Sequence, residues 1–433
     1  MAVYAGKPAL PARGLFTSLG LVLLLIMGGC GGGGSSGSAG THVTLPASSA
    51  SLTDTNVALV EVRQGPLDNV NMPYVSVTVC LPGSVASSTN CRTIDNVLLD
   101  TGSTGLRLFA GAVSGLALPQ QTVTGVGTVY ECAQFVTTLA LGKVHLADIS
   151  IGGEKASSLP VQLMDSSFTL APTSRCGQAP ILAAATDSSR NLQGLGANGI
   201  LGVSHFINDG QSYFSCATFS PGCALVGMAT GKQVQNPVTR FTSGNNNGVV
   251  VQLAPLPSAS GVASVQGYLI FGVETRTNNR LGSAKVVPMN TTGNYFTTNY
   301  KGQAYDSSIF DSGSNGLFFD DADIPLCGGT FSDFYCPAGT LKLSASLPVL
   351  NSAPVAVDFS VANASNLFTS RNASSTFVFD NLSAPITNPV QPANISPFFI
   401  WGLPFYLGRS VYTVIEGSQI NSSLSGPLNA FSN

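Results

Sequence analysis

The sequence predicts an all-β protein, and two observations carry this prediction. Charged residues make up only 9 % of the 433 residues, against about a quarter in an average soluble domain, while Val, Thr, Ser, Gly and Phe are abundant. Short apolar segments also recur between turn signals, several with the period-two alternation of strands. Helical periodicity with recognisable caps is scarce. The length allows two substantial cores or one large core.

The expected strands begin after about residue 53. In chain order they are ALVEVR, YVSVTVC, NVLLD, VTTLALG, VHLADISIGG, NGILGV, GVVVQLAPL, GYLIFGV and AKVVPM. Residues 205–248, which include the run SGNNNG, are expected to form a long loop or insertion. Residues 360–396 are rich in Asn, Ser and Pro, so we expect surface strands and loops there.

The N-terminus predicts export. Lys7 and Arg13 precede the apolar run LFTSLGLVLLLIM, which has the position and length of a signal-peptide core. The following MGGC resembles the lipobox of bacterial lipoproteins, which implies lipidation of Cys30; ordinary cleavage nearby is the alternative. We expect a signal peptide at 1–29 and a Gly/Ser-rich tether at 30–52. The resemblance implies a lipid-anchored protein of the bacterial cell envelope, on the periplasmic side of the outer membrane or at the cell surface.

Eight cysteines remain beside Cys30, and an even number is typical of disulfides in exported proteins. The positions suggest local pairs, although the sequence leaves other connectivities open. The candidate pairs are Cys80–Cys91, Cys132–Cys176, Cys216–Cys223 and Cys327–Cys336. The first and the last pair each close a short polar loop and are therefore the best supported.

Composition excludes several kinds of partner. The net charge is only −3 and there is no basic cluster, so a nucleic acid is not an expected partner. His42, His145 and His205 are scattered and no Cys-x-x-Cys occurs, so we expect neither a metal nor another cofactor. We expect a monomer that contacts the membrane only through its lipid anchor.

The most informative feature is an internal repeat. Residues 98–109, LLDTGSTGLRLF, align with residues 309–320, IFDSGSNGLFFD, so that Asp100 meets Asp311. About a hundred residues later, each copy is followed by two apolar residues and a glycine, in NGILGV and FFIWGLPFY. A lone Asp-Thr-Gly is a common turn after a strand. Two copies with matched flanks indicate two related halves.

The repeat resembles the aspartate loops of pepsin-like aspartic peptidases, which are two-lobed β proteins with one such loop in each lobe. GYLIFGVETRTNNRLGSAKVVPM is similar to the crossover between lobes, and GLPFYLGRSVYTVIEG to the segment after the second apolar-apolar-Gly. The resemblance implies a bilobal fold with an N-terminal lobe at 53–274, a C-terminal lobe at 275–433 and an active site in the cleft between them. The chain also resembles an uncharacterised family of bacterial lipoproteins.

The resemblance casts Asp100 and Asp311 as a catalytic pair that grips a water molecule. Two carboxyls this close cannot both ionise readily, so they share a proton and supply an acid and a base together. Their neighbours would hold the carboxyls coplanar, brace the loops and turn the chain tightly. These supporting residues are Thr101, Gly102, Ser103, Ser312, Gly313 and Ser314 beside the dyad, and Gly202 and Gly402 beneath the loops.

The hairpin flap of the family carries a tyrosine. Tyr130, in GTVYECAQF, is the candidate because it precedes a predicted strand pair; a tyrosine of an ordinary hairpin or of the core is the alternative. Arg107 stands where the family commonly has a tryptophan that supports the flap, and a surface arginine is the alternative there.

Two functions remain open from the sequence. The first is an exported, lipid-anchored aspartic endopeptidase that binds extended polypeptides as an added strand. The second is a catalytically silent surface lipoprotein that binds a peptide or a glycan on the same scaffold, because a fold alone does not confer an activity. A Gly-x-Ser-x-Gly match at 33–37 lies in the tether without strand–turn–helix context, which argues against a serine hydrolase.

Overall fold

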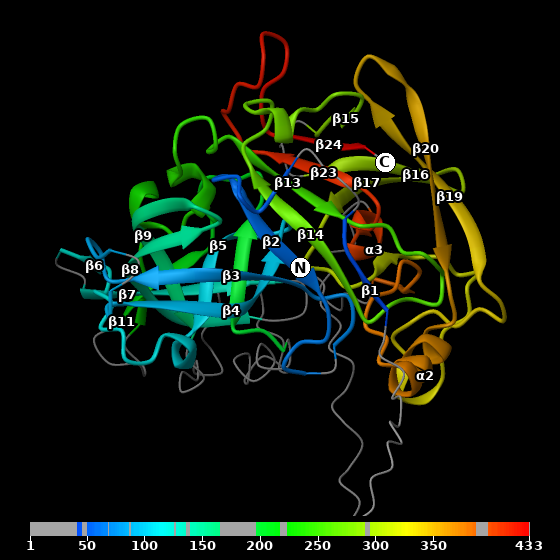
Figure 1. Ribbon diagram of the computed structural model, residues 1–433, viewed down its shortest axis with the longest axis horizontal. Coiled ribbons are helices and arrows are strands. Elements are labelled where there is room, and N and C mark those ends of the chain that lie inside the picture. Colours follow the sequence, from blue (N-terminus) through cyan, green and yellow to red (C-terminus); the bar gives the residue numbers. More distant parts are fainter. Residues whose placement is uncertain are drawn as a thin grey trace, which may run out of the picture.

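The computed structural model has the all-β fold that the sequence predicts. It describes residues 41–45, 50–67, 69–85, 88–124, 127–135, 139–164, 196–216, 223–290, 295–386 and 397–432. Within these segments the strands form two sheets, one of seventeen strands and one of seven. In Figure 1 the larger sheet occupies the left and centre of the molecule, and the yellow and orange strands of the smaller sheet lie on the right.

The larger sheet takes its strands from both ends of the chain. Its members are β1 (His42–Val43), β2 (Val57–Val62), β3 (Pro73–Cys80), β4 (Cys91–Asp100), β5 (Thr104–Phe109), β6 (Thr122–Val123), β7 (Gly127–Gln134), β8 (Leu139–Ile151), β9 (Glu154–Met164), β10 (Gly199–Val203), β11 (Ser212–Cys216), β12 (Cys223–Leu225), β13 (Gly248–Leu253), β14 (Ser264–Phe271), β15 (Lys285–Val287), β23 (Ser410–Val414) and β24 (Leu428–Ser432).

The smaller sheet and the two α-helices belong to the second half of the chain. The strands are β16 (Phe296–Tyr300), β17 (Gln303–Phe310), β18 (Leu317–Phe319), β19 (Leu341–Val349), β20 (Ser352–Val361), β21 (Ser383–Ala384) and β22 (Phe398–Trp401). The helices are α2 (Ala364–Ser374) and α3 (Leu403–Tyr406), with 3₁₀ turns η1 (Ala110–Val113), η3 (Thr230–Lys232), η4 (Pro237–Arg240), η5 (Thr277–Asn279) and η6 (Gly329–Phe331).

The two sequence repeats form the same three-stranded unit. In the first, β10 runs parallel to β4 and antiparallel to β5, with Leu201 opposite both Leu99 and Leu106. In the second, β22 runs parallel to β17 and antiparallel to β18, with Trp401 opposite both Phe310 and Leu317. Each aspartate loop therefore lies where a strand ends beside its apolar-apolar-Gly partner, in two halves of related structure.

The two halves share strands and a core. β23 pairs with β13, and β24 pairs with both β23 and β15, so the end of the chain returns to the larger sheet. One continuous apolar cluster contains Leu99 and Leu201 from the first repeat and Phe310 and Trp401 from the second. At the other end, β1 lies inside the range predicted for the tether and pairs in parallel with β14.

β8 differs from the sequence prediction. VTTLALG and VHLADISIGG were expected as two strands, but Leu139–Ile151 is one continuous strand, paired with β7 and β9. Gly142 does not break it. A Cβ atom at Gly142 would lie 1.9 Å from the carbonyl oxygen of Leu163, so the glycine permits a close approach of β9.

Two segments contain more regular structure than the sequence predicts. Residues 205–248 were expected as a loop, but β11 and β12 form a hairpin there and β11 pairs with β7. Within 360–396, expected as strands and loops, the chain forms α2. The side chain of Asn363 caps this helix by accepting a hydrogen bond from Asn366 N at 3.1 Å. Phe368 anchors it in an apolar cluster that the local sequence does not reveal.

Two of the predicted disulfides are confirmed. Cys80 is bonded to Cys91 and Cys327 to Cys336. Cys132 is also disulfide-bonded, but its predicted partner Cys176 lies outside the described residues, as does Cys30. Cys216 and Cys223 are cross-strand partners in register. The disulfides indicate an oxidising environment.

Replacing Gly142 with alanine is expected to lower the free energy of unfolding by about 1–3 kcal/mol, because the added methyl group meets the Leu163 carbonyl. Urea unfolding followed by tryptophan fluorescence measures this. Gly111→Ala is the matched control, since a Cβ there meets nothing within 4 Å. Equal stability of the two variants would contradict the close approach of β8 and β9.

Candidate active site

The two aspartates occupy matching places in the fold. Asp100 is the last residue of β4, and Asp311 directly follows β17. Asp100 lies opposite Gly202 in the parallel pairing, and Asp311 N donates to Trp401 O at 3.0 Å. Both aspartates are fully buried. The strands thus bring together two carboxyls that are 211 positions apart in the sequence.

Each carboxyl receives the same pair of hydrogen bonds from its own loop. Gly102 N donates to Asp100 Oδ1 at 2.9 Å, and Ser103 Oγ donates to Asp100 Oδ2 at 2.5 Å. In the second repeat, Gly313 N and Ser314 Oγ donate to Asp311 Oδ1 and Oδ2 at 2.9 and 2.7 Å. One backbone and one hydroxyl donor therefore fix the orientation of each carboxyl.

The loops brace each other through two hydroxyl groups. Thr101 Oγ1 accepts from Ser312 N at 3.0 Å and donates to Phe310 O at 3.2 Å. Ser312 Oγ accepts from Thr101 N at 3.1 Å and donates to Leu99 O at 2.8 Å. All four contacts are buried, so neither loop can shift without breaking hydrogen bonds of the other.

Four glycines keep the site closely packed. A Cβ atom at Gly102 would lie 2.7 Å from Asp311 Cγ, and one at Gly313 would lie 2.7 Å from Asp100 Oδ1. Each loop glycine therefore packs against the carboxyl of the opposite repeat. Gly202 lies against the backbone of Ser103, and Gly402 lies against the carbonyl oxygen of Ser314, beneath the two loops.

The surroundings of the two carboxyls affect their pKa values differently. Burial and the charge of Asp311 raise the pKa of Asp100 to about 7. Burial also acts to raise the pKa of Asp311, whereas hydrogen bonds from Asp100 and Ser314 favour its ionised form and act to lower the pKa. Near pH 5 one proton is therefore shared by the pair, which leaves one carboxyl as an acid and the other as a base.

Sequence reasoning missed Tyr406, which supports the first loop. Its hydroxyl lies 2.8 Å from Thr101 Oγ1, and because that threonine donates to a carbonyl, the tyrosine is the donor. Tyr406 is buried at the end of α3, four residues after Gly402. The matching residue of the first repeat is Phe206, which has no hydroxyl, so the repeat pattern gives no signal for this contact.

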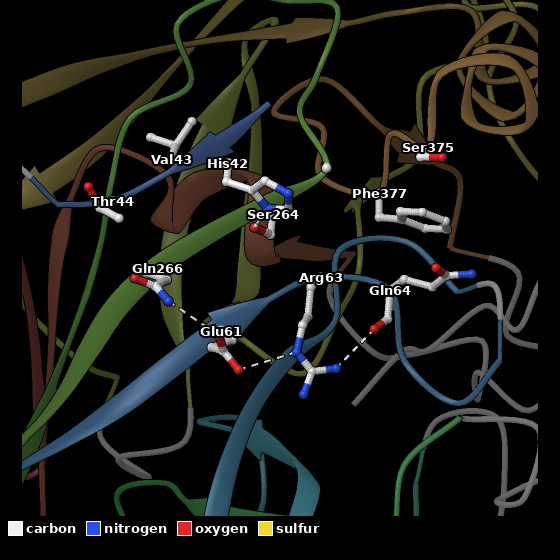
Figure 2. A pocket seen from close by; sticks show the side chains of 11 residues that line it. His42, Val43, Thr44, Glu61, Arg63, Gln64, Ser264, Gln266, Ser375 and Phe377 are labelled. Atoms are coloured by element: carbon white, nitrogen blue, oxygen red, sulfur yellow. Dashed lines mark hydrogen bonds and ion pairs between the residues drawn. The ribbon is translucent and has the colours of Figure 1, made fainter. Parts of the chain in front are cut away.

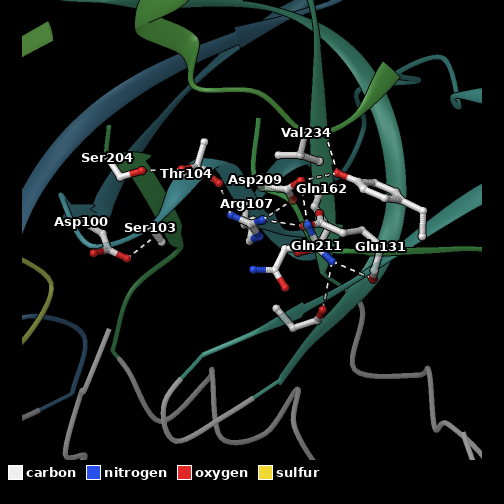
Figure 3. Close-up of polar contacts among 12 residues, drawn as sticks. Asp100, Ser103, Thr104, Arg107, Glu131, Gln162, Ser204, Asp209, Gln211 and Val234 are labelled. Atoms are coloured by element: carbon white, nitrogen blue, oxygen red, sulfur yellow. Dashed lines mark hydrogen bonds and ion pairs between the residues drawn. The ribbon is translucent and has the colours of Figure 1, made fainter. Parts of the chain in front are cut away.

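Arg107 is a buried residue, not a surface arginine. Its side chain is 1 % exposed and contacts Glu131 and Asp209, to one side of Asp100 in Figure 3. Tyr130 lies within β7, opposite Lys143 of β8 and Phe214 of β11, and is partly exposed. The Tyr130 ring lies beneath the ammonium group of Lys143, at 5.8 Å, and the ring of Phe135 faces the Arg107 guanidinium, at 5.7 Å.

Two surface pockets lie away from the aspartates. One, with a volume of about 510 Å³, is lined by His42, Glu61, Arg63 and Phe377 among others, and Figure 2 shows the Glu61–Arg63 ion pair within it. The other, of about 390 Å³, lies between β15, β20 and β24. The described side chains contain no group of three or more metal-ligating residues.

The comparisons with known proteins give a family and a distant structural match. Residues 52–431 match the sequence model of the family DUF3443, which is described as a protein of unknown function. The chain belongs to this family. Among solved structures, it is similar to the aspartic proteinase from Irpex lacteus, with 14 % identity, a TM-score of 0.45 and coverage of 87 % of this chain and 96 % of that one. No curated protein matches the chain.

Replacing Thr101 with valine in this DUF3443 protein is expected to lower the free energy of unfolding by about 3 kcal/mol, because Ser312 N and Phe310 O lose their buried partner. Thr101→Ser is the matched control, since serine keeps the hydroxyl and stands at this place in the second repeat. Urea unfolding compares the two variants. A serine variant as unstable as the valine variant would contradict the role of the hydroxyl.

The stability of the protein is expected to depend on pH through Asp100. Because the folded-state pKa of Asp100 is raised from 3.8 to about 7, its contribution is fully present below about pH 4 and is lost as the pH rises through 7. The free energy of unfolding of Asp100→Asn, relative to the wild type, should therefore rise between pH 4 and pH 8, by on the order of 4 kcal/mol.

Urea unfolding at the two pH values measures this change. Asp358→Asn is the control, because Asp358 is exposed on β20 and is not part of the dyad. A relative stability of Asp100→Asn that does not depend on pH would show that Asp100 is not protonated in the folded protein.

Proposed function

We propose that this DUF3443 protein is an aspartic endopeptidase that hydrolyses extended polypeptides with a water molecule activated between Asp100 and Asp311. The observation that carries the proposal is the matched pair of buried carboxyls, each held by a backbone N–H and a serine hydroxyl. A structural turn needs neither the second carboxyl nor the reciprocal bracing of the two loops.

The chemistry follows from the shared proton. The ionised carboxyl takes a proton from the water as its oxygen attacks the scissile carbonyl carbon, and the protonated carboxyl donates to the carbonyl oxygen. The resulting gem-diol then collapses, with proton transfer to the leaving amine. Ser103 and Ser314 hold the carboxyls in position throughout, so the residues need no metal and no covalent intermediate.

We further propose that the protein is exported and anchored by a lipid on Cys30, on the evidence of the lipobox-like MGGC. The two disulfides support an oxidising compartment. Within the described part of the chain, no helix is both long and apolar enough to cross a membrane.

Incubation of the chain without its signal peptide with a diverse peptide mixture from about pH 3 to pH 8 tests the peptidase proposal. Mass spectrometry of the products should show cleavage that declines as the pH rises through about 7, because Asp100 then loses its proton. Asp100→Asn and Asp311→Asn should each reduce the rate by about a hundredfold or more.

Glu154→Gln is the control for this experiment, because Glu154 is also buried but contacts Thr242 and Asn245, far from the dyad in the sequence. It should keep the wild-type rate. Cleavage that survives in both aspartate variants would refute the dyad. Peptide binding without cleavage at any pH would identify the second candidate, a catalytically silent binding protein. The observation that favours this candidate is Arg107, which stands where the family commonly has a tryptophan.

A further inference from the structure

A second cluster of buried ionisable side chains lies beside the Asp100 loop. Arg107 on β5, Glu131 on β7 and Asp209, between β10 and β11, have side chains that are 1 %, 0 % and 1 % exposed. Arg107 Nη2 contacts Glu131 Oε1 at 2.5 Å and Asp209 Oδ2 at 2.8 Å. Because one oxygen of Glu131 and one of Asp209 contact the same Arg107 nitrogen, the two carboxyls lie close to each other (Figure 3).

The cluster joins the aspartate loop to two other parts of the first lobe. Arg107 Nη1 donates to the carbonyl oxygen of Thr104 at 2.6 Å, one residue after the serine that holds Asp100. Asp209 Oδ1 accepts from the hydroxyl of Tyr213, on β11, at 2.7 Å. The cluster therefore ties the loop to β7 on one side and to the segment before β11 on the other.

The charges of this cluster do not balance when all three groups are ionised. One guanidinium faces two carboxylates, and an uncompensated buried charge is strongly unfavourable. Glu131 Oε2 has no hydrogen-bond partner among the described residues. A proton on Glu131 removes the excess charge.

The surroundings of Glu131 favour its protonated form. The charged or titratable groups that face the two acids are Arg107 on β5 and Tyr213 on β11. Burial raises the pKa of Glu131 well above its usual value; Arg107 opposes this shift, and the charge of Asp209 adds to it. Because a buried ion cluster contributes little net stability, stability alone does not explain its presence here.

We propose that Arg107, Glu131 and Asp209 form a proton-dependent latch that fixes the Asp100 loop to β7 and to the segment before β11 only while Glu131 is protonated. When the proton leaves, the excess negative charge drives Asp209 toward solvent. Asp209 is the part that moves, because it lies outside any strand and precedes Gly210, whose φ is 62°.

The latch would regulate the Asp100–Asp311 site of the proposed peptidase. This regulation rests on the proposed function, whereas the latch does not. The latch itself is a property of the folded chain and is tested without any cleavage. The sign follows from the raised pKa of Glu131: the latch is closed at low pH and opens as the pH rises.

Hydrogen–deuterium exchange with mass spectrometry tests the latch in peptides that cover β7 and residues 209–215. After correction for the intrinsic exchange rates, protection in the wild type is expected to fall by about tenfold or more between pH 5 and pH 8, since each pH unit above the pKa lowers the protonated fraction tenfold. Glu131→Gln, which is neutral at every pH, should remove this fall.

Two controls separate the latch from other buried acids. Glu154→Gln removes a buried glutamate on β9 that is outside the cluster, and Asp100→Asn removes the carboxyl of the dyad whose pKa is raised. Both should keep the wild-type pH dependence of protection in β7 and 209–215. Failure of the peptidase assay together with these exchange results would refute the proposed function and leave the latch in place.

Asp209→Asn gives a second test, because it leaves Arg107 opposite one carboxylate and should also remove the pH dependence. The Asp209→Asn variant therefore tests the latch even if Glu131→Gln does not fold. Wild-type protection that is equal at both pH values overturns the latch, whatever the variants do. A pH-dependent loss of protection that persists in a folded Glu131→Gln or Asp209→Asn variant overturns it as well.

Discussion

The reciprocal hydrogen bonds between Thr101 and Ser312 are the constraint on which the rest of the site depends. Each hydroxyl accepts from the backbone of the opposite loop and donates to the strand that leads into that loop. Two loops far apart in the sequence therefore determine each other's position. The glycines that follow then bring each loop against the opposite carboxyl, and two aspartates that would otherwise end separate strands become one pair.

Some of the few charged residues of this protein lie in its interior. Only 9 % of the residues are charged, yet two pairs of carboxyls are buried within the first half of the chain and at its contact with the second. In the dyad, hydroxyl and backbone donors hold the two acids, which share a proton. In the latch, an arginine offsets part of the charge. The same electrostatic problem, two acids close together in a dry interior, thus occurs twice with different partners.

Several parts of the fold followed directly from residue patterns. Alternating apolar segments predicted the strands, and the paired motifs predicted that Leu106 and Leu317 would occupy equivalent places, as the strand registers show. Residue patterns did not predict the elements whose formation depends on long-range contacts. α2 has no apolar periodicity and forms because its cap and its core contacts support it. β8 continues through Gly142 because β9 passes close to it.

The sequence by itself determined the all-β class, the two aspartate loops and the two short disulfide loops, because each depends on residues that are close together or repeated. Only the tertiary structure decided how Arg107 is used. A single arginine in a strand gives no sign of its partners, and Glu131 and Asp209 come from elements that meet it only after the sheet has formed. Tyr406 is a similar case, since its hydroxyl reaches Thr101 across 305 positions of sequence through packing that no local pattern encodes.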